Sequence, residues 1–331
     1  MRTLMIAAVV LLAACGTDAV SLDHYPDAFH DAFCRYLVKC GDVENVDTCK
    51  AINLGLNFRL SASTTAAVDM GKTRYSGENA QECLDALAAR SCDVTSQSGR
   101  VAPEACREIV IGTEHDGAAC AQDAECISQV CDVPSCNMAC CTGTCTGDTA
   151  PGLAKAGESC ANAVCDDTSF CDDAVMMCAA LKPADAFCTS PLECAYGLDC
   201  LQTGTCGALP GPGDACTGPC RDEGTTCSPT SRTCVKVELG GAACTTSADC
   251  SRLYTCDATK HCSAGPALGA ACTIGQRCGT DRAFCDVPMG QAMGTCVLPK
   301  ANGAPCQRNS DCDSRSCDPA TLVCGPEQVC I

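Results

Sequence analysis

Cysteines recur in this chain in blocks of four at a nearly fixed interval, and this regularity limits the possible folds more than any other feature. The first cysteines of five successive blocks lie 28 residues apart: Cys160, Cys188, Cys216, Cys244 and Cys272. A sixth block begins at Cys306, and a terminal Cys330 follows it. A fixed period of this length is typical of a tandem array of small units.

A large apolar core is not available to hold these units together. The chain has 331 residues, 39 cysteines, no tryptophan and only 3% aromatic residues. One buried apolar side chain contributes about 1.5–3 kcal/mol, whereas ordering the backbone costs about 1–2 kcal/mol per residue. Two disulfides per block, each worth about 2–4 kcal/mol, can offset that deficit. We therefore expect small disulfide-rich tandem repeats with short β-hairpins and little regular secondary structure.

The four cysteines of a block allow three connectivities. We favour bonds from the first cysteine to the third and from the second to the fourth. The expected pairs are Cys160–Cys171, Cys165–Cys178, Cys188–Cys200, Cys194–Cys206, Cys216–Cys227, Cys220–Cys234, Cys244–Cys256, Cys250–Cys262, Cys272–Cys285 and Cys278–Cys296. A glycine stands three residues before the first cysteine of each block except that of Cys188, where Asp185 takes its place. A glycine repeated at one register suggests a backbone with positive φ or a close approach.

Residues 23–115 differ in composition and predict a small all-α domain with six cysteines, preceding the array. They hold six of the eleven aromatic residues. Apolar spacing predicts helices over residues 23–40, about 46–59, 63–70 with Ser63 as its N-cap, 79–90 and 103–110. The 1.5 Å rise per residue places Cys34 too far from Cys40, and Cys83 too far from Cys92, for a disulfide. We expect the bonds Cys34–Cys83, Cys40–Cys49 and Cys92–Cys106.

The N-terminal residues MRTLMIAAVVLLAAC predict export from the cytoplasm. Arg2 precedes an apolar run, residues 4–12, that is too short to span a bilayer as a helix. The sequence LAAC at residues 12–15 resembles the lipobox of bacterial lipoproteins. The resemblance implies that residues 1–14 are a signal peptide and that Cys15 carries the lipid, at the start of a lipidated linker over residues 15–22. Two or more acyl chains make a stable anchor.

An ordinary secretory signal, cut a few residues later, is the alternative interpretation of this segment. Gly16 stands where well-studied inner-membrane lipoproteins have aspartate. We therefore expect the outer membrane or the cell surface as the location.

Residues 116–150 open the array with seven cysteines: Cys120, Cys126, Cys131, Cys136, Cys140, Cys141 and Cys145. The adjacent pair Cys140-Cys141, followed by Gly143 and Cys145, resembles the Dickkopf N-terminal cysteine-rich domain. Sequences of this kind recur in bacterial cysteine-rich lipoproteins. The resemblance covers about 30 residues and concerns the cysteine pattern, so receptor binding by animal Dickkopf proteins is not carried over. Residues 151–331 hold six further modules and the terminal cysteine, so some bond must leave the within-block scheme.

The sequence shows no pattern of catalytic or metal-binding residues. It lacks the C-x₂-C pairs that zinc and iron–sulfur sites favour, and exported thiols tend to oxidise. Acidic residues precede the second cysteine of four blocks: Glu125, Glu193, Asp249 and Asp311. They lack the D-x-D-x-D-G run of a calcium loop, and we expect a solvated face. We expect no enzymatic activity, no cofactor and no metal.

The net charge of −18 argues against a nucleic-acid partner, because phosphate contacts need clustered Lys and Arg. We expect a non-catalytic, lipid-anchored surface protein, acting as an adhesion or binding module or as a spacer stalk built from an extended string of modules. Its partners would be the membrane, through Cys15, and an extracellular protein or glycan. A thiolate protein that sequesters metal in the envelope is the alternative.

Overall fold

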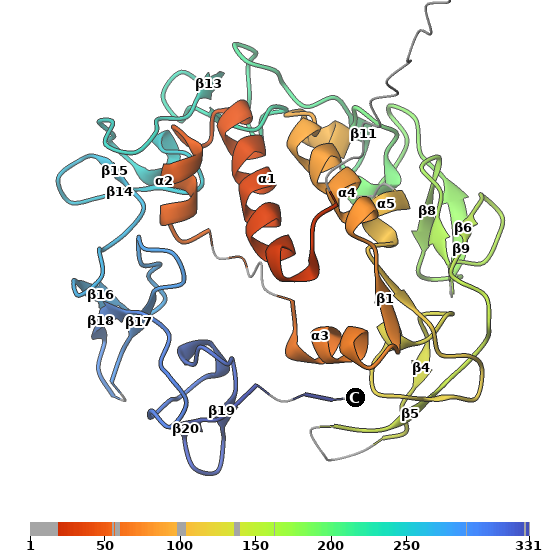
Figure 1. The fold of residues 1–331 in the computed structure, drawn as a ribbon. Coiled ribbons are helices and arrows are strands. Elements are labelled where there is room, and N and C mark those ends of the chain that lie inside the picture. Colours follow the sequence, from red (N-terminus) through yellow and green to blue (C-terminus); the bar gives the residue numbers. More distant parts are fainter. Residues whose placement is uncertain are drawn as a thin grey trace, which may run out of the picture.

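The computed structural model describes residues 19–54, 56, 60–97, 104–135, 140–161, 163–288, 290–327 and 329–330. The predicted signal peptide, residues 1–14, and Cys15 lie outside them. Within the described residues, a helical domain is followed along the chain by seven cysteine-stapled modules (Figure 1). The predicted fold class is confirmed, since the modules consist of short hairpins with little other regular structure.

The helical domain is built on one long helix, α1 (Tyr25–Cys40), which Gly41 ends in a left-handed conformation with φ of 80°. Its other elements are η1 (Leu22–His24), α2 (Val46–Ala51), α3 (Ala62–Asp69), β1 (Thr73–Tyr75), α4 (Gly77–Ala89), η2 (Val94–Gln97), α5 (Glu104–Arg107) and β2 (Val110–Gly112). Strands β1 and β2 pair antiparallel, with Arg74 opposite Ile111. The sequence did not predict this two-stranded sheet, because each strand has only three residues.

Helix boundaries follow the capping residues more closely than the apolar spacing. Ser61, not the predicted Ser63, accepts the hydrogen bond from the backbone N–H of Thr64 and begins α3. The predicted second helix ends at Ala51, well short of residue 59, although residues 55 and 57–59 lie outside the described residues. The last predicted helix stops at Arg107, and the chain then enters β2.

The three predicted disulfides of the helical domain, Cys34–Cys83, Cys40–Cys49 and Cys92–Cys106, are wrong. Helices α1 and α4 run in the same direction, since Lys39 Nζ in the last turn of α1 donates to the carbonyl oxygens of Ala89 and Arg90 at the end of α4. This places residue 92 beside residue 40. Helix α2 folds back along α1 after a turn at residues 41–45, which places residue 49 beside residue 34. The bonds are Cys34–Cys49, Cys40–Cys92 and Cys83–Cys106.

The seven modules share one connectivity, from the first cysteine to the third and from the second to the fourth. We number them 1 to 7 by their outer cysteines: residues 120–145, 160–178, 188–206, 216–234, 244–262, 272–296 and 306–324. The ten bonds predicted for modules 2 to 6, from Cys160–Cys171 to Cys278–Cys296, are all present in the structure. Module 7 follows the same rule with Cys306–Cys317 and Cys312–Cys324. Module 1 has the equivalent bonds Cys120–Cys131 and Cys126–Cys145, in which Cys145, the last of its seven cysteines, takes the place of the fourth.

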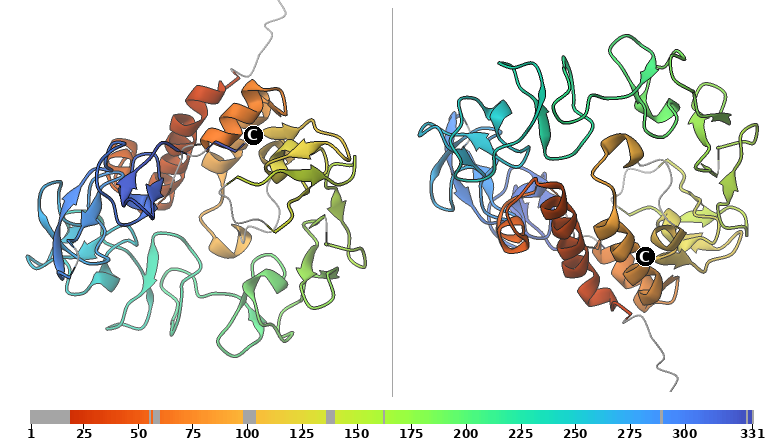
Figure 2. Two further views of the ribbon diagram at one scale, coloured as in Figure 1. Left: turned by 90° about the horizontal axis from the view of Figure 1, so that it is seen from below. Right: turned by 90° about the horizontal axis from the view of Figure 1, so that it is seen from above.

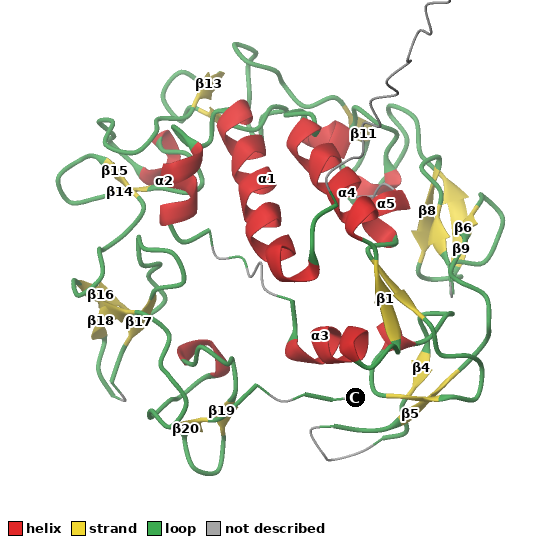
Figure 3. Ribbon diagram, in the orientation of Figure 1, coloured by secondary structure: helices red, strands yellow, loops and turns green. Residues whose placement is uncertain are grey.

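Each module contains an antiparallel pairing in which the third cysteine lies opposite the fourth, as with Cys171 and Cys178 (Figure 3). The strands are β3 (Ala119–Cys120), β4 (Cys131–Asp132), β5 (Gly143–Cys145), β6 (Leu153–Ala154), β7 (Val164–Cys165), β8 (Ser169–Asp172), β9 (Met177–Ala180), β10 (Asp199–Cys200), β11 (Cys206–Gly207), β12 (Thr225–Cys227), β13 (Cys234–Lys236), β14 (Thr255–Cys256), β15 (Cys262–Ser263), β16 (Ala271–Thr273), β17 (Phe284–Asp286), β18 (Met293–Val297), β19 (Cys317–Asp318) and β20 (Val323–Cys324). Four modules also contain a 3-10 turn: η3 (Asp123–Glu125), η4 (Pro191–Glu193), η5 (Ser247–Asp249) and η6 (Asn309–Asp311).

Three backbone hydrogen bonds recur in all seven modules and define a common frame. In module 5, Gly241 N–H donates to the Cys262 carbonyl, Cys262 N–H to the Ala242 carbonyl, and Ser251 N–H to the Glu238 carbonyl. The equivalent bonds elsewhere are all 2.7–2.9 Å long. The repeated glycine has positive φ in all six modules that contain it, which is one of the two predicted reasons for it, and Asp185 of module 3 adopts φ of 66° at the same position. Local backbone geometry, and not only disulfide spacing, therefore defines the repeat.

The array is not an extended string, so that expectation is wrong. The modules curve round the helical domain (Figure 2), and a disulfide joins Cys140 of module 1 to Cys330 beyond module 7, across 190 residues of sequence. Residues 140–330 therefore form a covalent ring. The sequence required some bond outside the within-block scheme, and Cys140–Cys330 supplies one. It could not be identified in advance, because nothing in the spacing tells which cysteine of module 1 meets the C-terminal end.

Candidate functional site

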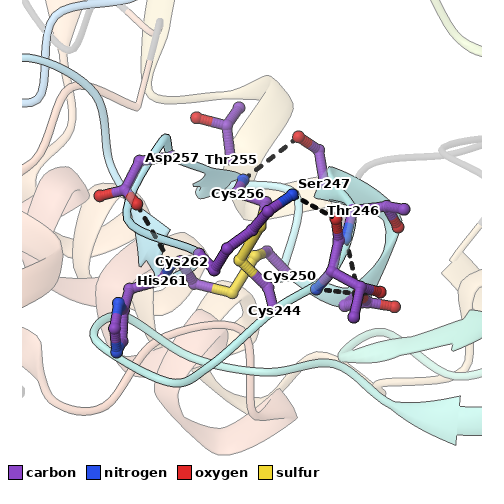
Figure 4. The surroundings of a disulfide bond; sticks show 12 residues. Cys244, Thr246, Ser247, Cys250, Thr255, Cys256, Asp257, His261 and Cys262 are labelled. Carbon is purple, nitrogen blue, oxygen red and sulfur yellow. Dashed lines mark hydrogen bonds between the residues drawn. A yellow bond between two sulfur atoms is a disulfide. The ribbon is translucent and has the colours of Figure 1, made fainter.

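The described cysteines are all in disulfides, so none offers a free thiolate in this structure. Trios of sulfur atoms within 4.8 Å of one another recur in the modules, and Cys244, Cys250 and Cys262 are one example. Figure 4 shows why: the Cys244–Cys256 and Cys250–Cys262 bonds lie against each other inside module 5. The trios therefore belong to the disulfide cores of the modules.

The acidic residues before the second cysteine form a structural clasp, not the solvated face that we predicted. The side chains of Glu125, Glu193 and Asp311 are buried, with at most 8% of the residue exposed. In each case the carboxylate accepts the backbone N–H of the residue after the first cysteine, as Asp311 does from Gln307 at 2.9 Å. Asp249 accepts from Thr245 in the same way, and its hydrogen bonds to Thr245 and Thr246 lower its pKa to about 2. Each carboxylate belongs to the third residue of its 3-10 turn and accepts N–H groups of the backbone before that turn, as Asp249 does in the capping box of η5.

The helical domain is attached to the array by hydrogen bonds and ion pairs that concentrate on modules 4 and 5. Tyr254 Oη of module 5 donates to Glu44 at 2.8 Å. Gly224 of module 4 packs so tightly that a Cβ there would lie 2.2 Å from the carbonyl oxygen of Cys40, and its φ of 67° also favours glycine. Tyr36, Leu37 and the disulfides of module 5 belong to one buried cluster. The helices therefore fix the curvature of this part of the array.

Two carboxylates and one guanidinium lie at the centre of this attachment. Arg252 of module 5 pairs with Asp42 at 3.2 Å and with Glu223 of module 4 at 3.4 Å. Burial raises the pKa of both Asp42 and Glu223 above their ordinary values, and Arg252 only partly opposes that effect. Burial, together with the nearby Glu223, raises the pKa of Tyr36 to about 12.

The raised pKa values predict that the free energy of unfolding depends on pH. The folded protein keeps protons on Asp42 and Glu223 that the unfolded chain has released, so the free energy of unfolding falls as pH rises from about 4 through the folded pKa values. Asp42→Asn removes one of these groups and is expected to flatten the decline. The measurement is Tm, with hydrogen exchange of residues 251–254, at several pH values between about 4 and 7. An unchanged slope in Asp42→Asn would contradict the prediction.

The hairpin turns between the third and fourth cysteines are the variable part of the repeat, and they are our candidate binding surface. Their tips are exposed. Their sequences are DDAVMM in module 2, LQTGT in module 3, SPTSRT in module 4, DATKH in module 5 and DPATLV in module 7. All five have positive φ two residues before the fourth cysteine, at Met176, Gly204, Arg232, Lys260 and Leu322. The backbone is thus constant while the chemistry of the turn changes.

Phe170 and Phe284, each directly before the third cysteine of its module, lie at module interfaces instead of on this surface. The ammonium groups of Lys182 and Lys300 lie 5.6 and 5.9 Å from the ring centroids of Phe170 and Phe284 in the preceding modules. These contacts join modules 2 to 3 and 6 to 7. The exposed apolar residues of the turns and of the segments before the first cysteine were not found from sequence. Comparing modules position by position could have revealed them.

None of the helices in the described residues is long and apolar enough to cross a membrane. No protein-family model, no curated protein and no solved structure matches this chain. The chain is therefore classified by its own architecture, as a cysteine-rich protein of tandem disulfide-bonded hairpin repeats.

Proposed function

We propose that this chain is an exported, lipid-anchored and non-catalytic binding protein of a bacterial envelope. It binds an extracellular protein or glycan through its hairpin turns. One observation carries the proposal: the seven modules keep the same hydrogen-bond frame while the exposed turns differ in sequence. Repeat proteins bind through surfaces of this kind, since a constant scaffold presents variable side chains. Of the two roles expected from sequence, the ring favours binding over a spacer, because a covalently closed array gains little reach per module.

The N-terminal sequence supports the location. The lipobox-like LAAC ending at Cys15 fits acylation, and the cysteine pattern of residues 120–145 resembles the Dickkopf N-terminal-like repeats of bacterial lipoproteins. The many disulfides fit an oxidising compartment outside the cytoplasm. A short helical domain next to the anchor would hold the ring close to the outer-membrane surface.

The experiment expresses the full chain in a bacterial host supplied with an alkyne analogue of palmitate. The wild-type protein is expected to take up the label, to fractionate with membranes and to be cut by protease added to intact cells. Cys15→Ala is expected to lose the label and to leave the membrane fraction, while intact mass before and after alkylation shows the same number of disulfides. Label uptake that does not depend on Cys15, or many alkylated thiols in the mature protein, would overturn the proposal.

A further inference from the structure

Modules 2 and 3 carry exposed apolar side chains at an unusual density. Eight of the eighteen exposed large hydrophobic residues in the described part of the chain lie between residues 153 and 196, so these two modules differ from the rest of the array. The most exposed of the eight are Val175 and Phe187, at 63% and 69%. We define the module 2–3 face by Val175, Met176, Met177, Phe187 and Leu192, of which the least exposed, Met177, is at 37%. Apolar groupings of this kind on a soluble surface mark interaction sites.

The helical domain does not use this face for its own attachment in the described residues. The hydrogen bonds and ion pairs that join the two parts reach modules 1, 4, 5 and 6, through Lys72, Glu223, Tyr254 and Asp281 respectively. Modules 2 and 3, drawn in green in Figure 2, arch away from α1 and α4 in both views. These contacts are therefore made outside the module 2–3 face.

Comparison among the modules shows that the scaffold does not need these side chains. Phe187 stands directly before the first cysteine of module 3, where modules 1, 4, 5 and 6 have Ala119, Ala215, Ala243 and Ala271. Its backbone pairs with Thr205 as that of Ala215 pairs with Thr233, so an alanine supports the same geometry. Met176 occupies the positive-φ turn position that Arg232 and Lys260 fill elsewhere. The module frame therefore does not require a large apolar side chain at these positions.

The charge around the face limits what can bind there. Residues 153–206 contain eight acidic residues and two lysines, a net charge of −6. Asp173 lies in the exposed turn beside Val175, and the exposed Asp185 precedes Phe187 by two residues. Lys182 is paired with Glu193. Like charges disfavour a second copy of this chain, nucleic acid and anionic lipid, whereas a basic partner gains from complementarity.

We propose that the module 2–3 face binds a basic amphipathic polypeptide segment, whose apolar side chains pack against Phe187 and the Val175–Met177 turn while its Lys or Arg side chains meet the surrounding carboxylates. This deepens the proposed binding function and rests on it. A few apolar anchors inside a charged rim supply most of the affinity in such an interface. The partner is named by its chemistry alone, since the face fixes charge and apolarity but no sequence.

The test uses the whole purified protein and an 18-residue synthetic peptide of Leu and Lys designed as an amphipathic helix, measured by fluorescence anisotropy at about 0.15 M salt. The variant Phe187→Ala with Met176→Lys takes residues that other modules hold at the same positions, so it is expected to fold. We expect it to weaken peptide binding roughly tenfold or more. Ile274→Ala in module 6 is the matched control, because Ile274 is 70% exposed outside the face, and it is expected to bind like the wild type.

Three outcomes would overturn the inference. The first is that a peptide with Ser in place of Leu binds as tightly as the Leu/Lys peptide, which would show that net charge alone accounts for peptide binding. Equal losses in Phe187→Ala/Met176→Lys and in Ile274→Ala would show that the face is not specific. Concentration-dependent dimers abolished by Phe187→Ala would show that a second copy covers the face. None of these outcomes affects the labelling and fractionation that test the lipid-anchored location, so the two proposals can fail separately.

Discussion

Reduction in strong reductant, with a chelator present, is expected to abolish the fold of the modules. The reason is that their buried clusters consist almost entirely of disulfides. In module 7 the buried members of the cluster are Cys306, Cys312 and Cys324, and in module 1 they are also all cysteines. Each disulfide contributes about 2–4 kcal/mol through the entropy of the unfolded chain, and the modules have few large apolar side chains to replace that contribution.

The helical domain supplies the internal comparison for this experiment. Its cluster includes Tyr36, Leu37, Val43 and Ile52, which bury real apolar area in addition to their disulfides. Limited proteolysis and hydrogen exchange after reduction are therefore expected to show complete loss of protection in residues 160–324 and partial retention in α1 and α4. The chelator removes any metal that reduced thiols could bind. A reduced array that keeps its protease resistance would contradict the claim that disulfides replace a core.

The fold class and the bonding rule of the repeat could be predicted from sequence because both depend on local spacing. Cysteines that recur in blocks of four can close small loops within each block, and the glycine three residues before the first cysteine marks the positive-φ turn. Asp185 adopts the same conformation without being glycine, which shows that the surrounding frame imposes it. The predictions for modules 2 to 6 needed no knowledge of how one module lies against another.

The predictions that failed depend on the path of the backbone in three dimensions. Cys40 meets Cys92 because α1 and α4 run in the same direction, and helix periodicity contains no information about that direction. The buried clasp formed by Glu125 and Asp311 was missed because an acidic residue in a loop is exposed by default, and only the backbone shows which N–H group it accepts from. The closure through Cys330 was missed because it depends on the summed curvature of seven modules.

The candidate binding surface illustrates the same division. The variation among the turns is visible in the sequence, but the exposure of Phe187 becomes informative only when its position is aligned with the alanines of the other modules. That alignment requires the module frame, which the backbone hydrogen bonds define. From the sequence alone, Phe187 would be assigned to a small apolar core.

Opening the ring with Cys140→Ser and Cys330→Ser is expected to release the C-terminal end of the array. The bond spans 190 residues, and the chain-entropy relation sets an upper limit of about 5 kcal/mol on its contribution to the free energy of unfolding. The actual contribution is smaller, because the other disulfides already shorten the loop in the unfolded chain. Two hydrogen bonds also hold this end to α3, from Ala62 N–H to Glu327 and from Cys330 N–H to Ser63. We expect loss of hydrogen-exchange protection at these residues and a larger radius of gyration in small-angle scattering.

A cleavage experiment makes the covalent closure visible directly. A protease site inserted between Thr149 and Ala150, in the exposed link before module 2, cuts the chain at a point that, among the described disulfides, only Cys140–Cys330 spans. On a denaturing non-reducing gel, the cut wild-type protein is expected to remain one band, and the Cys140→Ser/Cys330→Ser variant to separate into two. Cys306→Ser/Cys317→Ser is the matched control, because it removes a bond within module 7 and leaves the ring closed. Separation of the cut wild-type protein into two bands would show that the array is open, and would remove the reason for favouring a binding role over a spacer role.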